Sequence, residues 1–169
     1  LYGLFDILAM AGELWSIITG APPPEPGFDV RVVGPSREPF RCWGGVPVAP
    51  DGSFADNAGA DVVLIPDLLV DLDADPRRRW PEAAAWVARE HDAGAAICTV
   101  CTGSLLLADT GLLDGREATT HWSCVPLFQR YHPRVRLRAE RLLVAADPDQ
   151  RIVTAGGASA WQDMALYLI

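Results

Sequence analysis

An apolar run that passes directly into a helix constrains this chain more than any other stretch. Residues 95–100 are Ala-Ala-Ile-Cys-Thr-Val, whose β-branched centre indicates a buried strand, and Gly103-Ser104 followed by three leucines indicates a helix. Cys101 lies between them. A strand that enters a helix without a loop forms a sharp elbow, whose side chain points out from the carboxyl edge of a sheet. We therefore expect an α/β fold in which Cys101 faces a crevice.

The elbow also determines the chemistry that we expect of Cys101. The first-turn N–H groups of Thr102 and Gly103 are free donors, and the helix dipole favours a thiolate at the helix start. Gly103 lets another backbone or a ligand approach closely. A strand cannot meet a helix at one residue within the favoured backbone regions, so we predict a positive φ for Cys101. Cys101 is the candidate nucleophile.

The other three cysteines, Cys42, Cys98 and Cys124, are interpreted as packing residues, because free cysteine is among the most buried residue types. We expect Cys42 and Cys124 to lie away from Cys101. Cys98 and Cys101 have redox-motif spacing, but Cys98 falls inside the predicted strand rather than at a helix start. Four irregularly spaced cysteines do not form a disulfide framework, and we predict a reducing, cytoplasmic location.

Further apolar runs complete a doubly wound, mainly parallel sheet with helices on both faces. We predict strands at residues 30–33, 62–65, 96–100 and 152–154, and a hairpin that joins 141–146 to 151–155. Another small hairpin is expected at 43–48, with its aromatics covering the core, and the proline-rich residues 20–27 form a loop. Predicted helices cover residues 4–15, 80–92 (stopped by Gly94) and 122–131, with a last helix that Ser159 caps and that reaches Ile169.

Two blocks carry a family resemblance. Residues 100–122, Val-Cys-Thr-Gly-Ser-Leu-Leu-Leu-Ala-Asp-Thr-Gly-Leu-Leu-Asp-Gly-Arg-Glu-Ala-Thr-Thr-His-Trp, resemble the nucleophile-elbow block of the ThiJ/PfpI superfamily. The Thr-Thr-His-Trp ending and residues 154–168 are similar to the sensor halves of AraC-type transcriptional regulators. The resemblance implies a three-layer, flavodoxin-like or glutamine amidotransferase-like fold and covers nearly the whole chain.

The resemblance also implies partners for Cys101. The matching histidine of the family approaches the elbow cysteine, so His121 is its expected proton partner or a wall of a ligand pocket, although a histidine at a helix start is usually a cap-region residue. The family has a glycine pair after the strand at 62–65 that helps to hold an oxyanion; here Asp67 and Leu68 replace it. A carboxylate there opposes a thiolate, unless Asp67 caps the turn and faces water. The candidate ligand-binding residues are Thr102, Gly103, Asp67, Leu68 and Trp122.

The chain opens at Leu1 in helical periodicity, whereas members of the family begin with a strand upstream. We expect a single domain over residues 1–169 that lacks this strand, the acidic partner of Cys101 near it, and any C-terminal helix-turn-helix domain. The sheet should then have a gap beside the elbow strand, where backbone groups stay unpaired.

The charge balance limits the partners. Fourteen basic and 22 acidic residues give a net charge of −8, which argues against a nucleic-acid or anionic-membrane surface on this chain. Any DNA must bind through a missing C-terminal part. No apolar run approaches the roughly 18 residues of a membrane span. No cofactor is predicted, and three separated histidines, among them the loop residue His132, argue against a zinc site.

Two function classes follow. The first is a sensor domain of an AraC-type regulator, a homodimer whose elbow crevice binds a small-molecule effector. The second is a cysteine-dependent hydrolase, hydratase or deglycase in which Cys101 attacks an electrophilic carbon and His121 handles protons. An inert elbow in a structural oligomer is a third reading. We favour the sensor because of the Thr-Thr-His-Trp block, the Gly-Gly-Ala-Ser-Ala-Trp block and the replacement of the glycine pair by Asp67 and Leu68.

Overall fold

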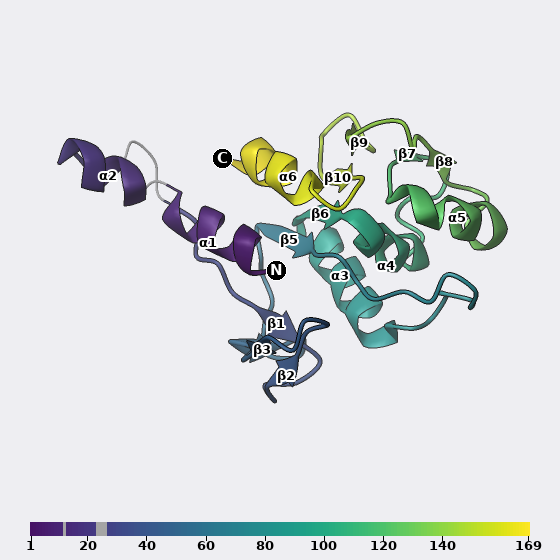
Figure 1. Ribbon diagram of the computed structural model, residues 1–169, viewed down its shortest axis with the longest axis horizontal. Coiled ribbons are helices and arrows are strands. Elements are labelled where there is room, and N and C mark those ends of the chain that lie inside the picture. The colour runs from purple at the N-terminus through teal and green to yellow at the C-terminus, as the bar shows by residue number, and fades with distance from the viewer. Residues whose placement is uncertain (12, 23–26) are drawn as a thin grey trace.

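The computed structural model describes residues 1–11, 13–22 and 27–169, and its centre is a four-stranded sheet (Figure 1). The strand order is β5-β6-β10-β9, for β5 (Val62–Ile65), β6 (Ala96–Val100), β10 (Ile152–Ala155) and β9 (Leu143–Ala145). The first three strands are parallel, and β9 is antiparallel to β10. The predicted strands at 62–65, 96–100 and 152–154 are therefore confirmed, as is the hairpin before residue 155.

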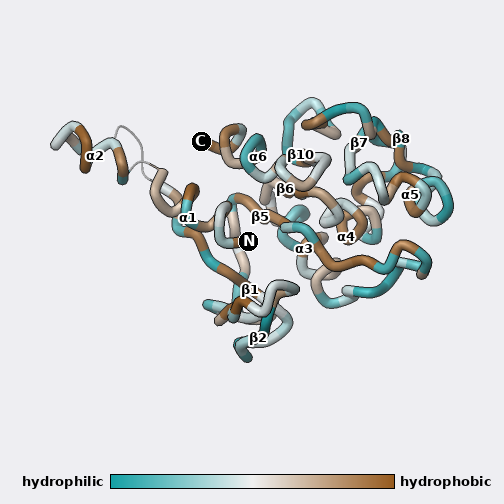
Figure 2. The backbone as a smooth tube through the Cα atoms, viewed as in Figure 1, coloured by the Kyte–Doolittle hydropathy of each residue, from teal (hydrophilic) through white to brown (hydrophobic). Residues whose placement is uncertain are grey.

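Helices cover both faces of this sheet. On one face lie α3 (Pro81–Ala93), α4 (Ser104–Asp109) and α5 (Val125–Tyr131); on the other lie α1 (Tyr2–Met10) and α6 (Ala160–Leu168) (Figure 1). Alternate residues of β6 join the two cores: Ile97 packs with the first set, and Cys98 and Val100 pack with the second. Hydrophobic colouring along β5 and β6 agrees with burial on both faces (Figure 2). The α/β architecture is as predicted.

The helices differ from prediction mainly at their ends. Gly94 stops α3 in the left-handed region, with a φ of 117°. The predicted helix over 122–131 begins with a 3-10 turn, η2 (Trp122–Cys124), before α5. Ser159 precedes α6 but makes no capping hydrogen bond. The predicted helix over 4–15 is divided, because the extended backbone of Ala11 ends α1 before α2 (Glu13–Thr19).

The prediction of a main-sheet strand at residues 30–33 is wrong. Only β1 (Val33–Gly34) forms, and it pairs in parallel with β4 (Gly52–Ser53) in a separate small sheet. The backbone of Val32 is instead occupied by Asp51: its N–H donates to the carboxylate at 2.8 Å, and its carbonyl accepts from the Asp51 N–H at 2.7 Å. These bonds hold the segment against its own loop.

The small hairpin is present, but its aromatics, Phe40 and Trp43, are both exposed and do not cover the core. β2 (Phe40–Arg41) is antiparallel to β3 (Pro47–Val48). Trp43, in the turn, is 86% exposed, so its predicted packing role is wrong. The proline-rich loop predicted at 20–27 lies partly outside the described residues.

The predicted gap beside the elbow strand is also wrong, because β6 pairs with β5 on one side and β10 on the other. In the described ranges, the two edge strands of this sheet are β5 and β9. A two-stranded parallel pair, β7 (Glu117–Ala118) with β8 (Arg136–Leu137), completes the fold. Within the part of the chain that the structure describes, no single helix is long and apolar enough to cross a membrane; α1 and α2 taken together, as a bent pair, reach that length and composition.

Candidate functional site at the Cys101 elbow

Cys101 occupies the strained position that the sequence predicts. β6 ends at Val100, and a 3-10 turn, η1 (Cys101–Gly103), leads into α4 without a loop. The φ of Cys101 is 57°, a left-handed conformation that is uncommon for a residue with a side chain. The residue is 7% exposed. Surrounding packing must enforce this backbone, because such strain does not persist alone.

Gly103 fixes how closely the elbow approaches the neighbouring strand. A Cβ atom at this position would lie 2.4 Å from the carbonyl oxygen of Pro66 and 2.8 Å from that of Ile65. Both distances are shorter than real Cβ contacts. The predicted close approach is confirmed, and the approaching group is the end of β5. Only glycine fits here without moving α4 away from the sheet.

Two buried hydroxyls brace the carbonyl group of Cys101. Ser104 Oγ lies 3.0 Å and Thr120 Oγ1 lies 3.3 Å from the Cys101 carbonyl oxygen, and the two hydroxyl oxygens are 2.8 Å apart. The N–H of Thr119 donates to Thr154 Oγ1 of β10 at 2.8 Å. Sequence reasoning missed these braces, although the Thr-Thr pair before His121 was a visible signal. They tie the elbow to the segment before His121, and the Thr119 bond ties that segment to β10, the strand beside β6.

Thr102 occupies the backbone of Leu68. Its hydroxyl accepts from the Leu68 N–H at 2.8 Å and donates to the Leu68 carbonyl at 2.7 Å. The amide at the position where the resemblance implies an oxyanion donor therefore already has a partner within the chain. Thr102 and Leu68 act as a clamp between the elbow and the segment after β5.

A cavity of about 310 Å³ opens beside Cys101. Asp67 lines it together with Cys101, and α6 contributes Trp161. The remaining lining residues are Leu1, Gly3, Leu4 and Ala158. A Cβ at Gly3 would lie 2.8 Å from the Trp161 ring, so α1 and α6 meet closely at this wall. The cavity thus combines a thiol, a carboxylate, an aromatic ring and apolar side chains.

The environment of Cys101 does not favour a thiolate. Burial raises the pKa of its thiol, and the charge of Asp67 raises it further, whereas hydrogen bonds from Thr102 lower it. The N–H at the helix start acts in the expected direction, but it does not outweigh desolvation. Burial and Asp67 therefore oppose the expected thiolate, whose presence stays a prediction. The concern that Asp67 opposes the thiolate is supported.

His121 and Trp122 lie on the surface side of this region. His121 Nδ1 is 2.7 Å from the Ser123 hydroxyl, and its ring is tilted by 37° to that of Trp122, with centroids 5.3 Å apart. Trp122 is 73% exposed. Neither residue is among those that line the Cys101 cavity. A direct role of His121 with Cys101 stays a prediction.

Two of the other cysteines differ in their relation to the elbow. Cys98 packs in the same core as Cys101, and burial raises its pKa to about 12, in agreement with a packing role. Cys124 is fully buried; burial raises its pKa, and so does the charge of Cys101. Cys124 packs in the core on the other face of the sheet from Cys101, and it is not among the residues that line the Cys101 cavity.

The geometry of the elbow agrees with a family comparison. The model of the DJ-1/PfpI family matches residues 13–169. The chain belongs to the DJ-1/PfpI family. A solved structure of an AraC family transcriptional regulator from Pseudomonas putida shares the fold, with a TM-score of 0.73 at 16% sequence identity, and the match covers 98% of this chain and 80% of that one.

Curated relatives of this DJ-1/PfpI domain include regulators and an enzyme. The chain is 29% identical to the HTH-type transcriptional regulator CdhR of Pseudomonas aeruginosa, over 95% of this chain and 50% of CdhR. It is 32% identical to the HTH-type transcriptional regulator GbdR of that organism, over 74% of this chain and 32% of GbdR. The isonitrile hydratase of Pseudomonas putida is 28% identical over 85% of this chain and 59% of the enzyme. The chain therefore spans about half of the length of CdhR and about a third of the length of GbdR.

Proposed function

We propose that this DJ-1/PfpI domain is the effector-sensing part of an AraC-type transcriptional regulator, and that the cavity beside Cys101 binds a small molecule. The observation that carries the proposal is that the surroundings of Cys101 disfavour nucleophilic catalysis. The Leu68 amide is held by Thr102, Asp67 lines the cavity, and the pKa of Cys101 is raised. Each feature opposes a thiolate nucleophile with an oxyanion donor, whereas none opposes ligand binding. Regulator relatives support the same class.

The full regulator would bind DNA through a segment outside this chain. The relatives' names specify helix-turn-helix regulators, and the chain covers 50% of CdhR. The net charge of −8 supports separation of the two tasks, because this domain repels a phosphate backbone. Sequencing the gene beyond Ile169 tests this arrangement. Helix-turn-helix units are the expected result; a stop codon directly after Ile169 would contradict it.

A blocking substitution tests the cavity itself. Ala158 is exposed at the cavity wall, so Ala158→Trp fills the entrance without disturbing the core. Ser159→Trp is the matched control, because Ser159 is exposed and adjacent but is not among the lining residues. In a thermal-shift screen of small metabolites, a hit should raise the Tm of the wild type and of Ser159→Trp but not of Ala158→Trp. Hits that survive in Ala158→Trp bind elsewhere and would refute this cavity as the sensor site.

The second candidate function is hydration of a small electrophile. It is supported by the left-handed conformation of Cys101 and by the likeness to isonitrile hydratase. Proton NMR would follow conversion of an alkyl isonitrile to the N-substituted formamide. The sensor proposal expects no turnover in the wild type. If the wild type turns over the isonitrile and Cys101→Ser does not, the sensor proposal is wrong and the domain is a hydratase.

A further inference from the structure

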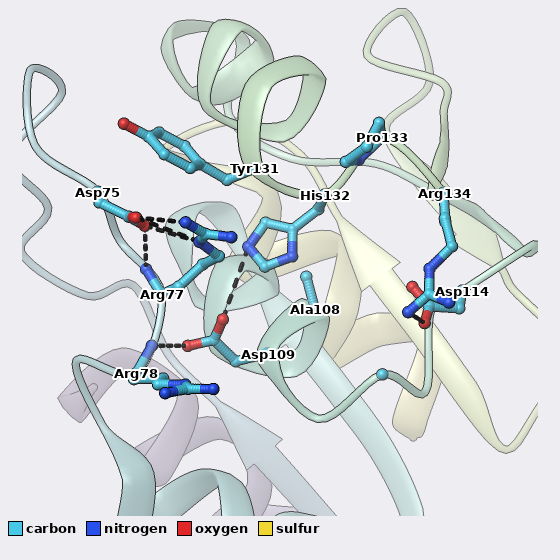
Figure 3. Close-up of a pocket in the computed structure, with 11 residues that line it drawn as sticks. Asp75, Arg77, Arg78, Ala108, Asp109, Asp114, Tyr131, His132, Pro133 and Arg134 are labelled. Carbon is cyan, nitrogen blue, oxygen red and sulfur yellow. Dashed lines mark hydrogen bonds and ion pairs between the residues drawn. The ribbon is translucent and has the colours of Figure 1, made fainter.

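A second and larger cavity lies at the opposite end of α4 from Cys101. Its volume is about 750 Å³, and three segments line it: the loop before α3, the end of α4 with the turn that follows, and the end of α5 (Figure 3). It shares no lining residue with the Cys101 cavity. A volume of this size falls within the range of small-molecule sites, roughly 300–1,000 Å³.

A buried histidine without a partner faces this cavity. His132, predicted as an ordinary loop residue, is not one: its side chain is only 8% exposed. Its Nε2 atom is buried and has no hydrogen-bond partner among the described residues. Asp109, whose side chain is 10% exposed, places Oδ1 3.7 Å from this nitrogen, which is too long for a hydrogen bond. Figure 3 shows the ring pointing toward Asp109.

The gap between these two groups has the chemistry of a hydroxyl site. Asp109 Oδ2 already accepts from the Arg78 N–H at 2.7 Å, so Oδ1 is the oxygen that remains for a ligand. An inserted hydroxyl group can donate to Oδ1 and accept from an Nε2–H of His132. Burial lowers the pKa of His132, which favours the neutral ring with its single N–H. A buried polar atom with no partner is otherwise costly.

The charges around the cavity leave one cation free. Arg77 is paired with Asp75 at 2.7 Å, and Arg134 is paired with Asp114 at 2.6 Å. Arg78 has no ion pair within the described ranges, although its backbone holds Asp109. A guanidinium group without a carboxylate partner is suited to a carboxylate or phosphate from a ligand.

We propose that this cavity binds a small hydroxylated anion. The hydroxyl group lies between His132 and Asp109, and the acidic group pairs with Arg78. Hydroxy acids and phosphorylated polyols both satisfy this description. The site is independent of the sensor cavity at Cys101, and its failure would leave the proposed function unchanged.

Isothermal titration of the purified chain tests the proposal with four probes. Glycerol 3-phosphate and lactate carry both groups, whereas inorganic phosphate and glycerol each carry one. At least one of the first pair should bind with a Kd that is about tenfold or more below that of either half, because two anchored groups act together. Tighter binding of glycerol 3-phosphate indicates a phosphate ligand, and tighter binding of lactate indicates a carboxylate ligand. No saturable binding of either compound, or inorganic phosphate binding as tightly as glycerol 3-phosphate with lactate silent, would overturn the proposal.

Variants locate the binding. Arg78 has a φ of 58°, so Arg78→Gly removes the guanidinium while keeping a permitted backbone. It should weaken binding about tenfold or more, as expected for loss of a charge-assisted pair. His132→Gln should weaken binding severalfold and leave inorganic phosphate unaffected. Arg79→Ala is the matched control: Arg79 is the next residue, stacks on Trp80 and does not line the cavity. Equal weakening in Arg79→Ala, or none in Arg78→Gly, would refute the site.

Discussion

The two ends of α4 carry buried ionisable groups in opposite positions relative to the helix dipole. Cys101 precedes the helix, whose positive end favours a thiolate, and Asp109 is its last residue, where the negative end opposes a carboxylate. Yet burial is the largest cause at both ends, and it raises the pKa of both groups. At Asp109 the helix dipole and burial both act to raise the pKa. At Cys101 the dipole acts to lower the pKa and burial acts to raise it, and the pKa is raised.

A glycine also holds each end of α4, but for different reasons. Gly103 has no room for a side chain beside Pro66 and Ile65, whereas Gly111 has room but a φ of 80°. We predict that Gly103→Ala lowers the free energy of unfolding by about 3 kcal/mol, because α4 must move from the sheet. Gly111→Ala should cost about 1 kcal/mol, for backbone strain alone. Urea unfolding measures both.

The control for this pair is Gly44→Ala. Gly44 has open space around it and lies outside the left-handed region, so its substitution should change the free energy of unfolding by less than about 0.5 kcal/mol. A loss in Gly103→Ala no larger than that in Gly111→Ala would contradict the steric account of the elbow.

The hydroxyl brace exists only at the Cys101 end, and its removal should be the next largest effect. Ser104→Ala and Thr120→Val each remove one oxygen beside the Cys101 carbonyl. We expect each to lower the free energy of unfolding by about 1–1.5 kcal/mol. Because the two hydroxyls also contact each other, the double variant should lose less than the sum. Strict additivity in this double-mutant cycle would show that the two groups act independently.

Local patterns in the sequence predicted the Cys101 end of α4 well. The strand at 96–100, the absence of a loop and the positive φ of Cys101 all follow from the apolar run and Gly103. The family resemblance added the match to regulators of transcription. These features depend on residues close together in the chain, where periodicity and steric rules are strongest.

The same methods failed where distant residues decide the outcome. The raised pKa of Cys101 depends on burial and on Asp67, and the His132 cavity depends on three separate segments. A histidine before a proline gives no sign that it will be buried beside Asp109. The alternating pattern of residues 30–33 predicts a strand of the main sheet, but the backbone of this segment is hydrogen-bonded to Asp51 instead. Tertiary context overrides local propensity in each case.

The dependence of stability on pH tests the effect of burial on His132, which lies beside Asp109. A histidine with a pKa lowered in the folded state binds protons more weakly than in the unfolded chain, so stability falls as the pH drops through the ordinary histidine pKa of about 6.5. Asp109, Arg77, Asp114 and Asp75 are the charged groups around this ring. His132→Gln should reduce the loss of stability between about pH 7 and pH 5, by less than about 1 kcal/mol.

Urea unfolding at several pH values measures this slope, and NMR titration of His132 measures its pKa directly. The raised pKa of Asp109 has the opposite sign, because its folded form binds protons more tightly and stability rises as the pH falls through that range. A titration of His132 above the ordinary histidine value would show that Asp109, rather than burial, controls the ring.

The last prediction addresses the competition at Cys101 through Asp67. Removing this charge in Asp67→Asn should lower the pKa of the thiol, and the larger thiolate fraction should raise the rate of iodoacetamide labelling at pH 7.5 about threefold. Asp71→Asn is the control, because Asp71 is exposed and does not line the cavity. In the wild type the half-exposed Cys42 should be labelled before the buried Cys101, the reverse of the order that the helix dipole alone predicts. Peptide mapping over a range of pH gives both results. Labelling of Cys101 before Cys42, at a rate that Asp67→Asn does not change, would contradict this prediction. The amide of Thr102 would then affect the pKa of the thiol more than burial and the neighbouring carboxylate together.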